Sequence, residues 1–452
     1  MRDQIAEALK GQKADYIEVR LEEGQSSQIR YRGKDLEEIG RSTSKGGCVR
    51  ALVKGGWGFV CFNDPSNLRD KVSMAVQHAR MVNGEKFSLS PVEPKVDVVA
   101  PTIKKDPAKV PLAKKKARLD EYNEIIWSTP NIQSSVIAYS DGRRKTYFAN
   151  SDGAYIEQER IDVNMRVMAL ARKDGDVQQA GFSLGSLGDF SFVDKLHDTV
   201  KETAQRAVDL LKAPPVKGGP YTVILDPVLA GVFCHEAFGH LSEADHVYEN
   251  DRLKEIMVLG KRFGGKHLNI ADGASIPGLR GSFKYDDEGT PATRTDLVKE
   301  GVLVGRLHSR ETAAKMGEKP SGNARAINYT FPPIVRMTNT LIEPGKATLE
   351  DLLSGVKEGV YAKNWYGGMT SMEMFTFSAG ESYMIRNGKI AEMVRPVMLS
   401  GNLFTTLENL DAIGNDLDMN QGGGCGKGGQ SPLPVSNGSP HIRIRKCLVG
   451  GS

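Results

Sequence analysis

The most constraining feature of this sequence is a strand followed at once by a capped helix, within residues 221–241. The run YTVIL is apolar and β-branched, which is typical of a buried strand. Asp226 and Pro227 come next and mark a helix start, with the aspartate as the N-cap and the proline at the first helical position. The stretch HEAFGH therefore lies late on a helix that follows a buried strand.

Two of the eight histidines, His235 and His240, lie five residues apart in this predicted helix. Helical residues advance by about 100° each, so on a regular α-helix the two imidazoles would point about 140° apart. A bulge or unwinding just before His240, aided by Gly239, would bring both imidazoles to one side. Two histidines on one side could chelate one metal ion. The alternative is that both are ordinary helix residues.

Glu236 directly follows the first presumed ligand, about a quarter-turn away, where its carboxylate suits a metal-bound water better than the metal itself. The metal would lower the pKa of that water towards neutrality and polarise a carbonyl. Glu236 would take the proton and later return it to the leaving amine. We therefore predict that Glu236 is a catalytic general base and that the reaction is amide hydrolysis.

Catalytic zinc usually has three protein ligands, so a third is expected. Glu243 and His246 are near in sequence, and Glu243 is within reach if the helix resumes. We prefer Cys425, in the glycine-rich run MNQGGGCGKGGQ, because a thiolate is a strong ligand for a borderline-soft ion. The glycines let the backbone come close, and Lys427 would help to keep the sulfur deprotonated. A flexible linker with an incidental thiol is the alternative.

Composition limits the class of protein. A length of 452 residues exceeds what one core usually serves, and the net charge of +4 is too small to indicate a nucleic-acid partner. No run approaches the roughly 20 apolar residues of a membrane span, and the start has no signal-peptide core, so we expect a cytoplasmic protein with no membrane association. Its five cysteines are sparse and never spaced Cys-x-x-Cys, which indicates reduced thiols.

Two kinds of pattern organise the first half of the chain. The alternation in YIEVRL, QIRYR and CVRALV predicts three short, half-buried strands, and Asp64 and Pro65 predict the start of a covering helix. Residues 91–116 are rich in Pro and Lys and predict a surface connection, and a long helix over 193–213 should end at Pro214. We therefore expect an N-terminal domain at residues 1–215 and a C-terminal domain at residues 216–452.

The motifs together resemble the TldD/PmbA family of metallopeptidases, in particular its metal-containing TldD branch. HEAFGH and GGGCGKGGQ carry the resemblance, with GGCVRALVKGGWGFVCFND, YFANSDGAYIEQER, YDDEGTPATRTDLVKEGVLVGRLHSRETAAKMG and SPHIRIRK, and these span nearly the whole chain. The resemblance implies a peptidase that acts on unstructured or small peptides. It also implies that His235, His240 and Cys425 bind one Zn²⁺, with iron or another divalent metal as the alternative ion, and that Glu236 is catalytic.

The resemblance further implies an α+β fold of two domains. The first is an N-terminal α/β-type sandwich, and the second is a largely antiparallel β catalytic domain with a metal-binding helix. Family members pair as homodimers or as heterodimers with a related TldE/PmbA-like subunit, enclosing the site. The sequence ESYMIRNGKIAEMV predicts a hairpin turning at Asn387-Gly388, whose strands could bind extended peptide by strand addition or only build the core.

Other polar residues are weaker candidates. Asp286, Asp287 and Glu288 do not have EF-hand spacing, so an exposed or domain-bridging loop is expected there. Arg294 is a candidate for binding a substrate carboxylate or an oxyanion. The spare candidates are His246, Tyr248 and His308.

Two other functions stay open at this point. The chain could be a peptide-binding or regulatory subunit with a structural metal, in which four ligands would close the coordination sphere. It could also be a metal-dependent amidohydrolase of a non-peptide substrate, because water activation assisted by a glutamate is not peculiar to peptides.

Overall fold

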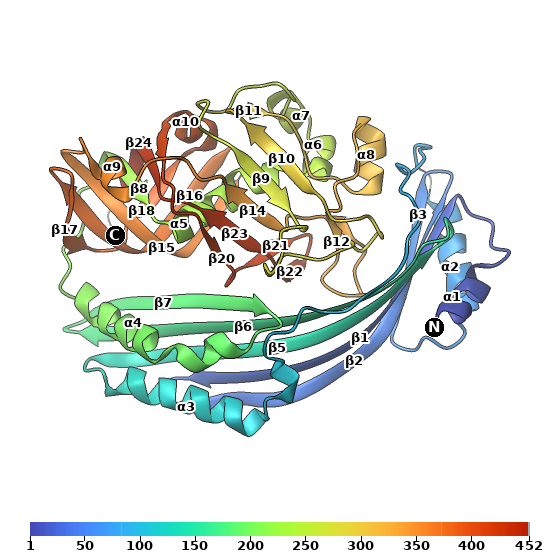
Figure 1. The fold of residues 1–452 in the computed structure, drawn as a ribbon, viewed down its shortest axis with the longest axis horizontal. Helices are drawn as coiled ribbons and strands as arrows, with labels where there is room; N and C mark the ends of the chain where they lie inside the picture. The colour runs from blue at the N-terminus through green and yellow to red at the C-terminus, as the bar shows by residue number, and fades with distance from the viewer. Residues whose placement is uncertain (83, 372, 451–452) are drawn as a thin grey trace.

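The computed structural model describes residues 1–82, 84–371 and 373–450 and has the expected α+β architecture. The first part of the chain builds one long, curved sheet in the order β3-β2-β1-β5-β6-β4, with β7 also paired to β6 (Figure 1). Its strands are β1 (Tyr16–Arg32), β2 (Asp35–Val53), β3 (Gly56–Phe62), β4 (Val96–Val99), β5 (Ile132–Asn150), β6 (Tyr155–Lys173) and β7 (Asp176–Leu187). All neighbours in this sheet are antiparallel except β4 and β6.

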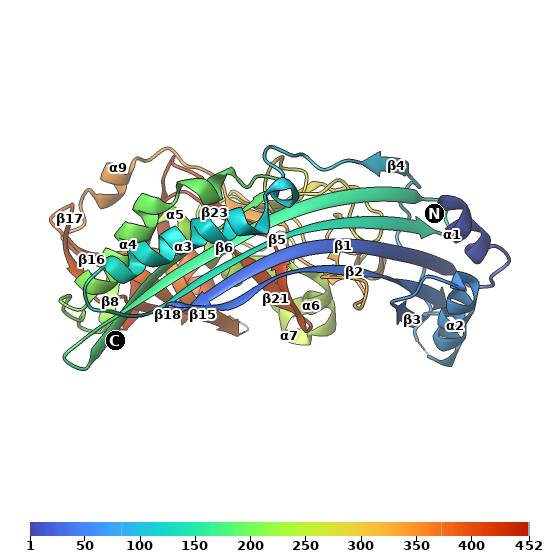
Figure 2. The same ribbon diagram turned by 90° about the horizontal axis from the view of Figure 1, so that it is seen from below.

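Four helices cover the apolar face of this sheet. They are α1 (Arg2–Leu9), α2 (Leu68–Met81), α3 (Leu112–Ser128) and α4 (His197–Leu210). Figure 2 shows α3 and α4 over one end of the sheet and α1 and α2 at the other. Strand β1 explains the arrangement, because Ile17, Val19 and Leu21 enter the core under α1 and α2, and Ile29 and Tyr31 enter the core under α3 and α4. The even-numbered Arg20 instead donates to the backbone oxygens of Asn328 and Phe331 in the second half of the chain.

Four predictions for the first half need correction. The helix predicted over 193–213 is α4, which spans only His197–Leu210 and follows a separate 3-10 turn at Ser191–Lys195. The runs YIEVRL and QIRYR belong to the single strand β1, because pairing with β2 and β5 continues through the polar residues between them. Helix α2 begins at Leu68 rather than at Asp64, whose carboxylate accepts a bond from the Ser66 N–H. Residues 91–116 contain β4, the turn Pro107–Lys109 and the start of α3 as well as loop. Of the lysines at the start of α3, Lys115 is buried against Asp141, whereas Lys114 is exposed.

The second half of the chain is largely antiparallel, as expected. One sheet has the order β15-β8-β24-β18-β16-β17, with β19 on β24, and a β15–β16 pairing closes five of these strands into a ring. Its strands are β8 (Gly219–Leu225), β15 (Glu358–Ser371), β16 (Met374–Arg386), β17 (Lys389–Val394), β18 (Met398–Asn402), β19 (Leu410–Ile413) and β24 (Ile442–Gly450). Asn387 and Gly388 both have positive φ and form the predicted hairpin turn between β16 and β17.

A second sheet and two short ribbons complete this half. The sheet has the order β11-β10-β9-β14-β23-β20, and the ribbons are β12-β13 and β21-β22. Their strands are β9 (Ile270–Gly273), β10 (Arg294–Lys299), β11 (Val302–Leu303), β12 (Ala324–Arg325), β13 (Ile334–Val335), β14 (Asn339–Ile342), β20 (Asp418–Asn420), β21 (Gly424–Lys427), β22 (Gln430–Pro434) and β23 (Ser436–Ser439). The helices are α5 (Pro227–Cys234), α6 (Ala244–Glu249), α7 (Asp251–Ile256), α8 (Arg310–Met316), α9 (Leu349–Leu353) and α10 (Leu403–Glu408).

The acidic loop at residues 286–288 joins the two halves and is largely buried. Glu288 pairs with Arg50 of β2 at 2.5 Å, and Asp287 lies 3.5 Å from Arg20 of β1. The carboxylate of Asp286 accepts bonds from the backbone N–H groups of residues 288, 290 and 324. The domain-bridging loop is therefore the correct alternative, and the exposed loop is wrong.

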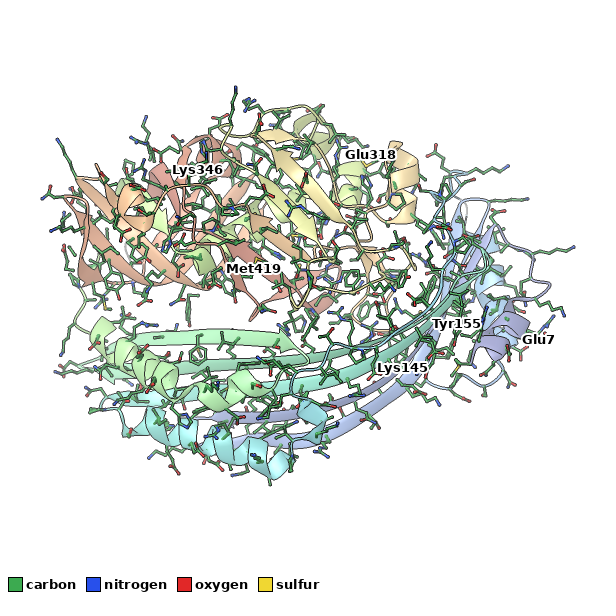
Figure 3. The ribbon with its side chains drawn as sticks, in the orientation of Figure 1. Glu7, Lys145, Tyr155, Glu318, Lys346 and Met419 are labelled. Carbon is green, nitrogen blue, oxygen red and sulfur yellow. The ribbon has the colours of Figure 1, made fainter. Side chains whose placement is uncertain are left out.

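Side chains from both halves fill the space between the long sheet and the second half of the chain (Figure 3). The division at residues 215 and 216 falls between α4 and β8 and stays a prediction. Within the described ranges, no helix has both the length and the apolar character that a membrane crossing requires.

Candidate metal centre

The helix that carries the histidines begins as the sequence predicts. Strand β8 ends at Leu225, the Asp226 carboxylate accepts a 2.9 Å bond from the Leu229 N–H, and Pro227 opens α5. The Asn364 N–H donates to the same carboxylate oxygen at 3.1 Å. Burial raises the pKa of Asp226 to about 6, although these backbone bonds oppose the rise.

This pKa predicts a pH dependence of stability. Because the folded value lies above the unfolded value of about 3.9, the stability linked to Asp226 is complete below pH 4 and is lost as pH rises through about 6. We expect this group to lower the free energy of unfolding by about 3 kcal/mol at most across that range. In Asp226→Asn the side-chain oxygen keeps the N-cap bond and nothing titrates, so urea unfolding at pH 4 to 7 should lack this decline. Identical pH profiles for the two proteins would contradict the assignment.

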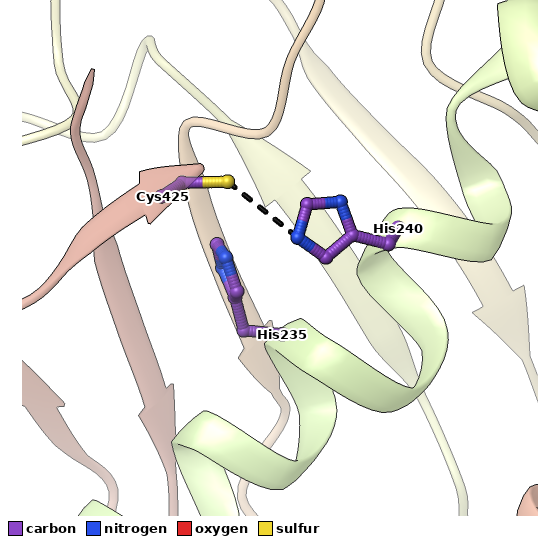
Figure 4. A group of neighbouring side chains, drawn as sticks. All are labelled: His235, His240 and Cys425. Carbon is purple, nitrogen blue, oxygen red and sulfur yellow. Dashed lines mark hydrogen bonds between the residues drawn. The ribbon is translucent and has the colours of Figure 1, made fainter. Parts of the chain in front are cut away.

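The predicted irregularity in the helix is a π-helical turn. After α5, residues His235–Gly239 form this turn, and the His240 N–H donates to the His235 carbonyl oxygen. A π-turn bonds residues five apart, so it takes up the extra residue in the histidine spacing. The two imidazole rings consequently lie 5.3 Å apart between centroids, on the same side of the helix (Figure 4).

Gly239 has a different role from the expected backbone freedom. Its φ of −58° and ψ of −53° are ordinary helical values that any residue adopts. A β-carbon at this position would instead lie 2.0 Å from the sulfur of Met337, which is fully buried. A side chain here would force Met337 to move, so glycine suits the packing of Met337 against the turn.

This contact gives a prediction about stability. We expect Gly239→Ala to lower the free energy of unfolding by about 1–3 kcal/mol, because the added methyl group overpacks the core. The cost should be smaller when Met337→Ala is already present, since the opposing side chain is then gone. Urea denaturation of the two single variants and the double variant measures this coupling. Strictly additive costs would show that Met337 is not the obstacle.

Cys425 is held in a defined hairpin, so the flexible-linker alternative is wrong. Strand β21 pairs with β22, and Cys425 lies opposite Leu433. The turn residues Gly428 and Gly429 have φ values of +58° and +75°, which glycine adopts without strain. The carbonyl oxygen of Cys425 accepts a 2.7 Å bond from the guanidinium of the fully buried Arg336.

The three predicted ligands come together. One donor atom from each of His235, His240 and Cys425 lies within 4.8 Å of the others, and the His240 Nε2 is 3.6 Å from the Cys425 sulfur (Figure 4). Across the described residues, no other cluster of three such side chains comes this close. Two imidazoles and a thiolate are ligands that zinc accepts readily.

Electrostatics and hydrogen bonding also fit a cation. Burial alone would raise the pKa of the Cys425 thiol, but the adjacent His235 and His240 lower it to about 4. Burial would lower the pKa of both histidines, yet the Cys425 sulfur raises that of His235, and Glu243 chiefly raises that of His240. The buried His235 Nδ1 has no hydrogen-bond partner among the described residues. A buried ring nitrogen without a partner is a polar atom that a bound ion would satisfy.

Glu243 orients His240, a role that the sequence did not reveal. Its fully buried carboxylate lies 2.9 Å from the His240 Nδ1, which leaves Nε2 facing Cys425. Burial alone would raise the pKa of Glu243. The charges of His240 and Lys427 have the larger effect and lower this pKa to about 2. Lys427 lies 3.2 Å from Glu243 and also pairs with Asp245. Lys427 therefore neutralises the carboxylate of Glu243. The pKa of the Cys425 thiol is lowered by the two histidines and not, as predicted, by Lys427.

Glu236 lies beside the three converging side chains. Its carboxylate is 4.0 Å from the His240 Nε2, and its side chain is 28% exposed, so water and a substrate can approach it. The weaker candidates are not among the three converging side chains, although His246 lies next to Glu243. Arg294 pairs with Asp296 and Glu343, His308 contacts Thr312 and Glu318, His246 is 3.8 Å from Glu243, and Tyr248 contacts Lys254 and Lys315.

Family models match most of the chain. They are the PmbA/TldA metallopeptidase domain 1 over residues 17–79, the central domain over 105–211 and the C-terminal domain over 218–451. A metalloprotease of Synechocystis sp. is 48% identical over 441 residues, which cover 97% of this chain and 95% of the relative. A zinc metalloprotease TldD homolog of Saccharolobus solfataricus is 30% identical over 446 residues, 97% of each chain.

Solved structures share the fold. TldE from Thermococcus kodakarensis has a TM-score of 0.77 at 17% identity and covers 100% of both chains. A putative modulator of a DNA gyrase from Thermotoga maritima has a TM-score of 0.77 at 21% identity, with 96% of each chain covered. With three family models over most of its length and full-length relatives, this chain belongs to the PmbA/TldA metallopeptidase family, the TldD/PmbA family that its motifs resemble.

Proposed function

We propose that this chain is a zinc-dependent metallopeptidase of the TldD branch that hydrolyses small or unstructured peptides in the cytoplasm. The observation that carries the proposal is the convergence of His235, His240 and Cys425, with donor atoms within 4.8 Å of one another and Glu236 alongside. The relative from Saccharolobus solfataricus, whose name includes zinc metalloprotease, adds support for the ion.

The three side chains divide the work of holding the ion. Cys425 supplies a thiolate at neutral pH because its pKa is about 4, and His240 is oriented by Glu243 through its other ring nitrogen. The unbonded Nδ1 of His235 is available as a donor. A zinc ion bound here would supply Lewis acidity, which polarises a substrate carbonyl and lowers the pKa of water.

Glu236 would carry the proton transfers. Its carboxylate accepts a proton from the water that attacks the carbonyl carbon, and it returns that proton to the nitrogen as the carbon–nitrogen bond breaks. The second proton of the water also passes to the leaving nitrogen, so the products are a carboxylate and a protonated amine, and Glu236 ends the cycle ionised. Its partial exposure lets it exchange protons with solvent, while the buried Glu243 is committed to His240.

Removal of the metal tests this function. We expect dialysis against a chelator to abolish hydrolysis of a mixture of short unstructured peptides, and one equivalent of Zn²⁺ to restore it. The apoprotein should keep its circular dichroism spectrum, because the hairpin and the π-turn are held by protein contacts. Hydrolysis that persists in fully metal-free protein would overturn the proposal. Cleavage of simple amides but of no peptide would favour the amidohydrolase alternative.

The structural-metal alternative is less well supported, because three rather than four candidate ligands converge in the described residues.

Pairing with a second copy or with a TldE/PmbA-like subunit is also part of the proposal. Its support is an exposed apolar group on neighbouring strands of one sheet, namely Met369, Met374, Met398 and Leu448. Light scattering that shows a monomer, alone and with such a subunit, would contradict pairing.

A further inference from the structure

A separate cavity of about 360 Å³ lies between the long sheet and the second half of the chain. Its wall comes from β1, β2, β5 and β6 on one side and from parts of segments 283–287, 325–328 and 432–434 on the other. Figure 1 shows the ribbons β12 and β21-β22 on the side of the second half that faces this sheet. The cavity has the size of a small-ligand site, and none of the three proposed metal ligands lines it.

Among the described residues, two arginines in this wall have no carboxylate within salt-bridge distance. Arg325 is 2% exposed and donates only to backbone oxygens, those of Met337 at 2.6 Å and Pro434 at 2.7 Å. Arg160 donates to the backbone oxygen of Arg280 at 2.9 Å. The guanidinium carbons of Arg160 and Arg325 lie 5.6 and 5.3 Å from the ring centroid of Phe283, so both charges gather around one aromatic side chain.

The acids in the same wall are already engaged. Asp162 pairs with Arg280, and Glu23 pairs with Lys45. Glu22 and Asp287 each pair with Arg20 and Arg144, and Asp286 accepts bonds from backbone N–H groups. Arg143, which also lines the cavity, pairs with Asp106 and Glu159. In the described part of the chain, the two arginines beside Phe283 are therefore the cavity's cations without a carboxylate.

Unpaired buried cations are unfavourable. A buried guanidinium loses its hydration, and for Arg160 and Arg325 the attraction of the nearby carboxylates of Asp162, Asp272 and Asp287 is too weak to offset that loss. Burial and the nearby charges of Arg160 and Arg336 lower the pKa of Arg325 to about 9, and burial lowers that of Arg160 to about 10. A planar guanidinium matches a carboxylate through two parallel hydrogen bonds, so an anion of this class would relieve the imbalance.

We propose that this cavity binds a carboxylate group through Arg160 and Arg325, with Phe283 fixing the two guanidinium planes. The carboxylate belongs to the C-terminal end of a peptide or to a free organic acid. Strand β22 lines the cavity and pairs with β21, which carries Cys425, so one hairpin joins this site to the proposed metal centre. The peptide form of the proposal rests on the proposed peptidase function, whereas carboxylate binding itself does not.

Calorimetric titration of the zinc-loaded Glu236→Gln protein tests the proposal without turnover. The probes are trialanine, trialanine amide and succinate. We expect trialanine to bind at least about tenfold more tightly than its amide, since only the acid pairs with the arginines. Arg160→Gln and Arg325→Gln should each remove that preference and weaken binding about tenfold. Arg143→Gln is the matched control, because Arg143 lines the same wall but already pairs with Asp106 and Glu159. This variant should change the affinity for trialanine less than twofold.

The outcomes separate the sources of the carboxylate. Succinate binding that requires both arginines, with no competition from trialanine, assigns the site to free acids and upholds the carboxylate site. Competition between the two probes assigns it to peptides. Equal binding of trialanine and its amide, with no succinate binding, overturns the proposal, as does unchanged affinity in a folded Arg160→Gln protein. Because heat of binding is measured, a failure of peptidase activity would not be mistaken for a failure of this site.

Discussion

Replacing Glu236 by glutamine should lower the kcat of peptide hydrolysis by about 100-fold to 10,000-fold, the range that general acid–base groups contribute. Glutamine has nearly the same shape but cannot accept the proton of the attacking water. The zinc content should stay at one equivalent, because Glu236 is beside the three ligands and is not one of them. KM should change little, since ground-state binding does not depend on this proton transfer.

Steady-state kinetics and metal analysis of the same preparation check this result. Glu255→Gln is the matched control, because this glutamate is 72% exposed on α7 and should leave kcat unchanged. Full activity in Glu236→Gln with zinc bound would remove Glu236 from the mechanism. Loss of the metal in the same variant would instead make Glu236 a ligand.

Replacing Cys425 by serine should lower the zinc affinity by more than about 100-fold. Loss of an outer-shell partner already costs 10–100-fold in known sites, and loss of the sulfur ligand should cost more. The variant also loses the buried thiolate that raises the pKa of His235. Peptidase activity should fall with the bound metal.

Competition with a chromophoric chelator measures the affinity, and cobalt loaded in place of zinc reports the sulfur directly through its thiolate-to-metal absorption band. Cys447→Ser is the matched control, because Cys447 is also buried but lies on β24, outside the one group of metal-binding side chains found in the described residues. Unchanged affinity and an unchanged cobalt spectrum in Cys425→Ser would exclude Cys425 from the coordination sphere.

Much of the candidate site could be predicted because its signals are local. Asp226 followed by Pro227 defines the helix start, and a histidine spacing of five requires an irregular turn. The choice of Cys425 over Glu243 rested on the chemistry of sulfur, and the structure brings Cys425 to both histidines. The role of Glu243 in orienting His240 could not be predicted from the sequence. It depends on where the buried Glu243 side chain points after the helix changes direction.

What the sequence by itself determined was therefore local: element types, the helix cap, the irregular turn, the hairpin at Asn387-Gly388 and the kinds of ligand available. Tertiary structure decided which partners meet, such as Lys115 with Asp141, Gly239 with Met337 and Lys427 with Glu243. The physical reason is that hydrophobic periodicity and caps act within one or two turns of chain. Ion pairs and close packing between residues far apart in sequence depend on distances that only the folded chain sets.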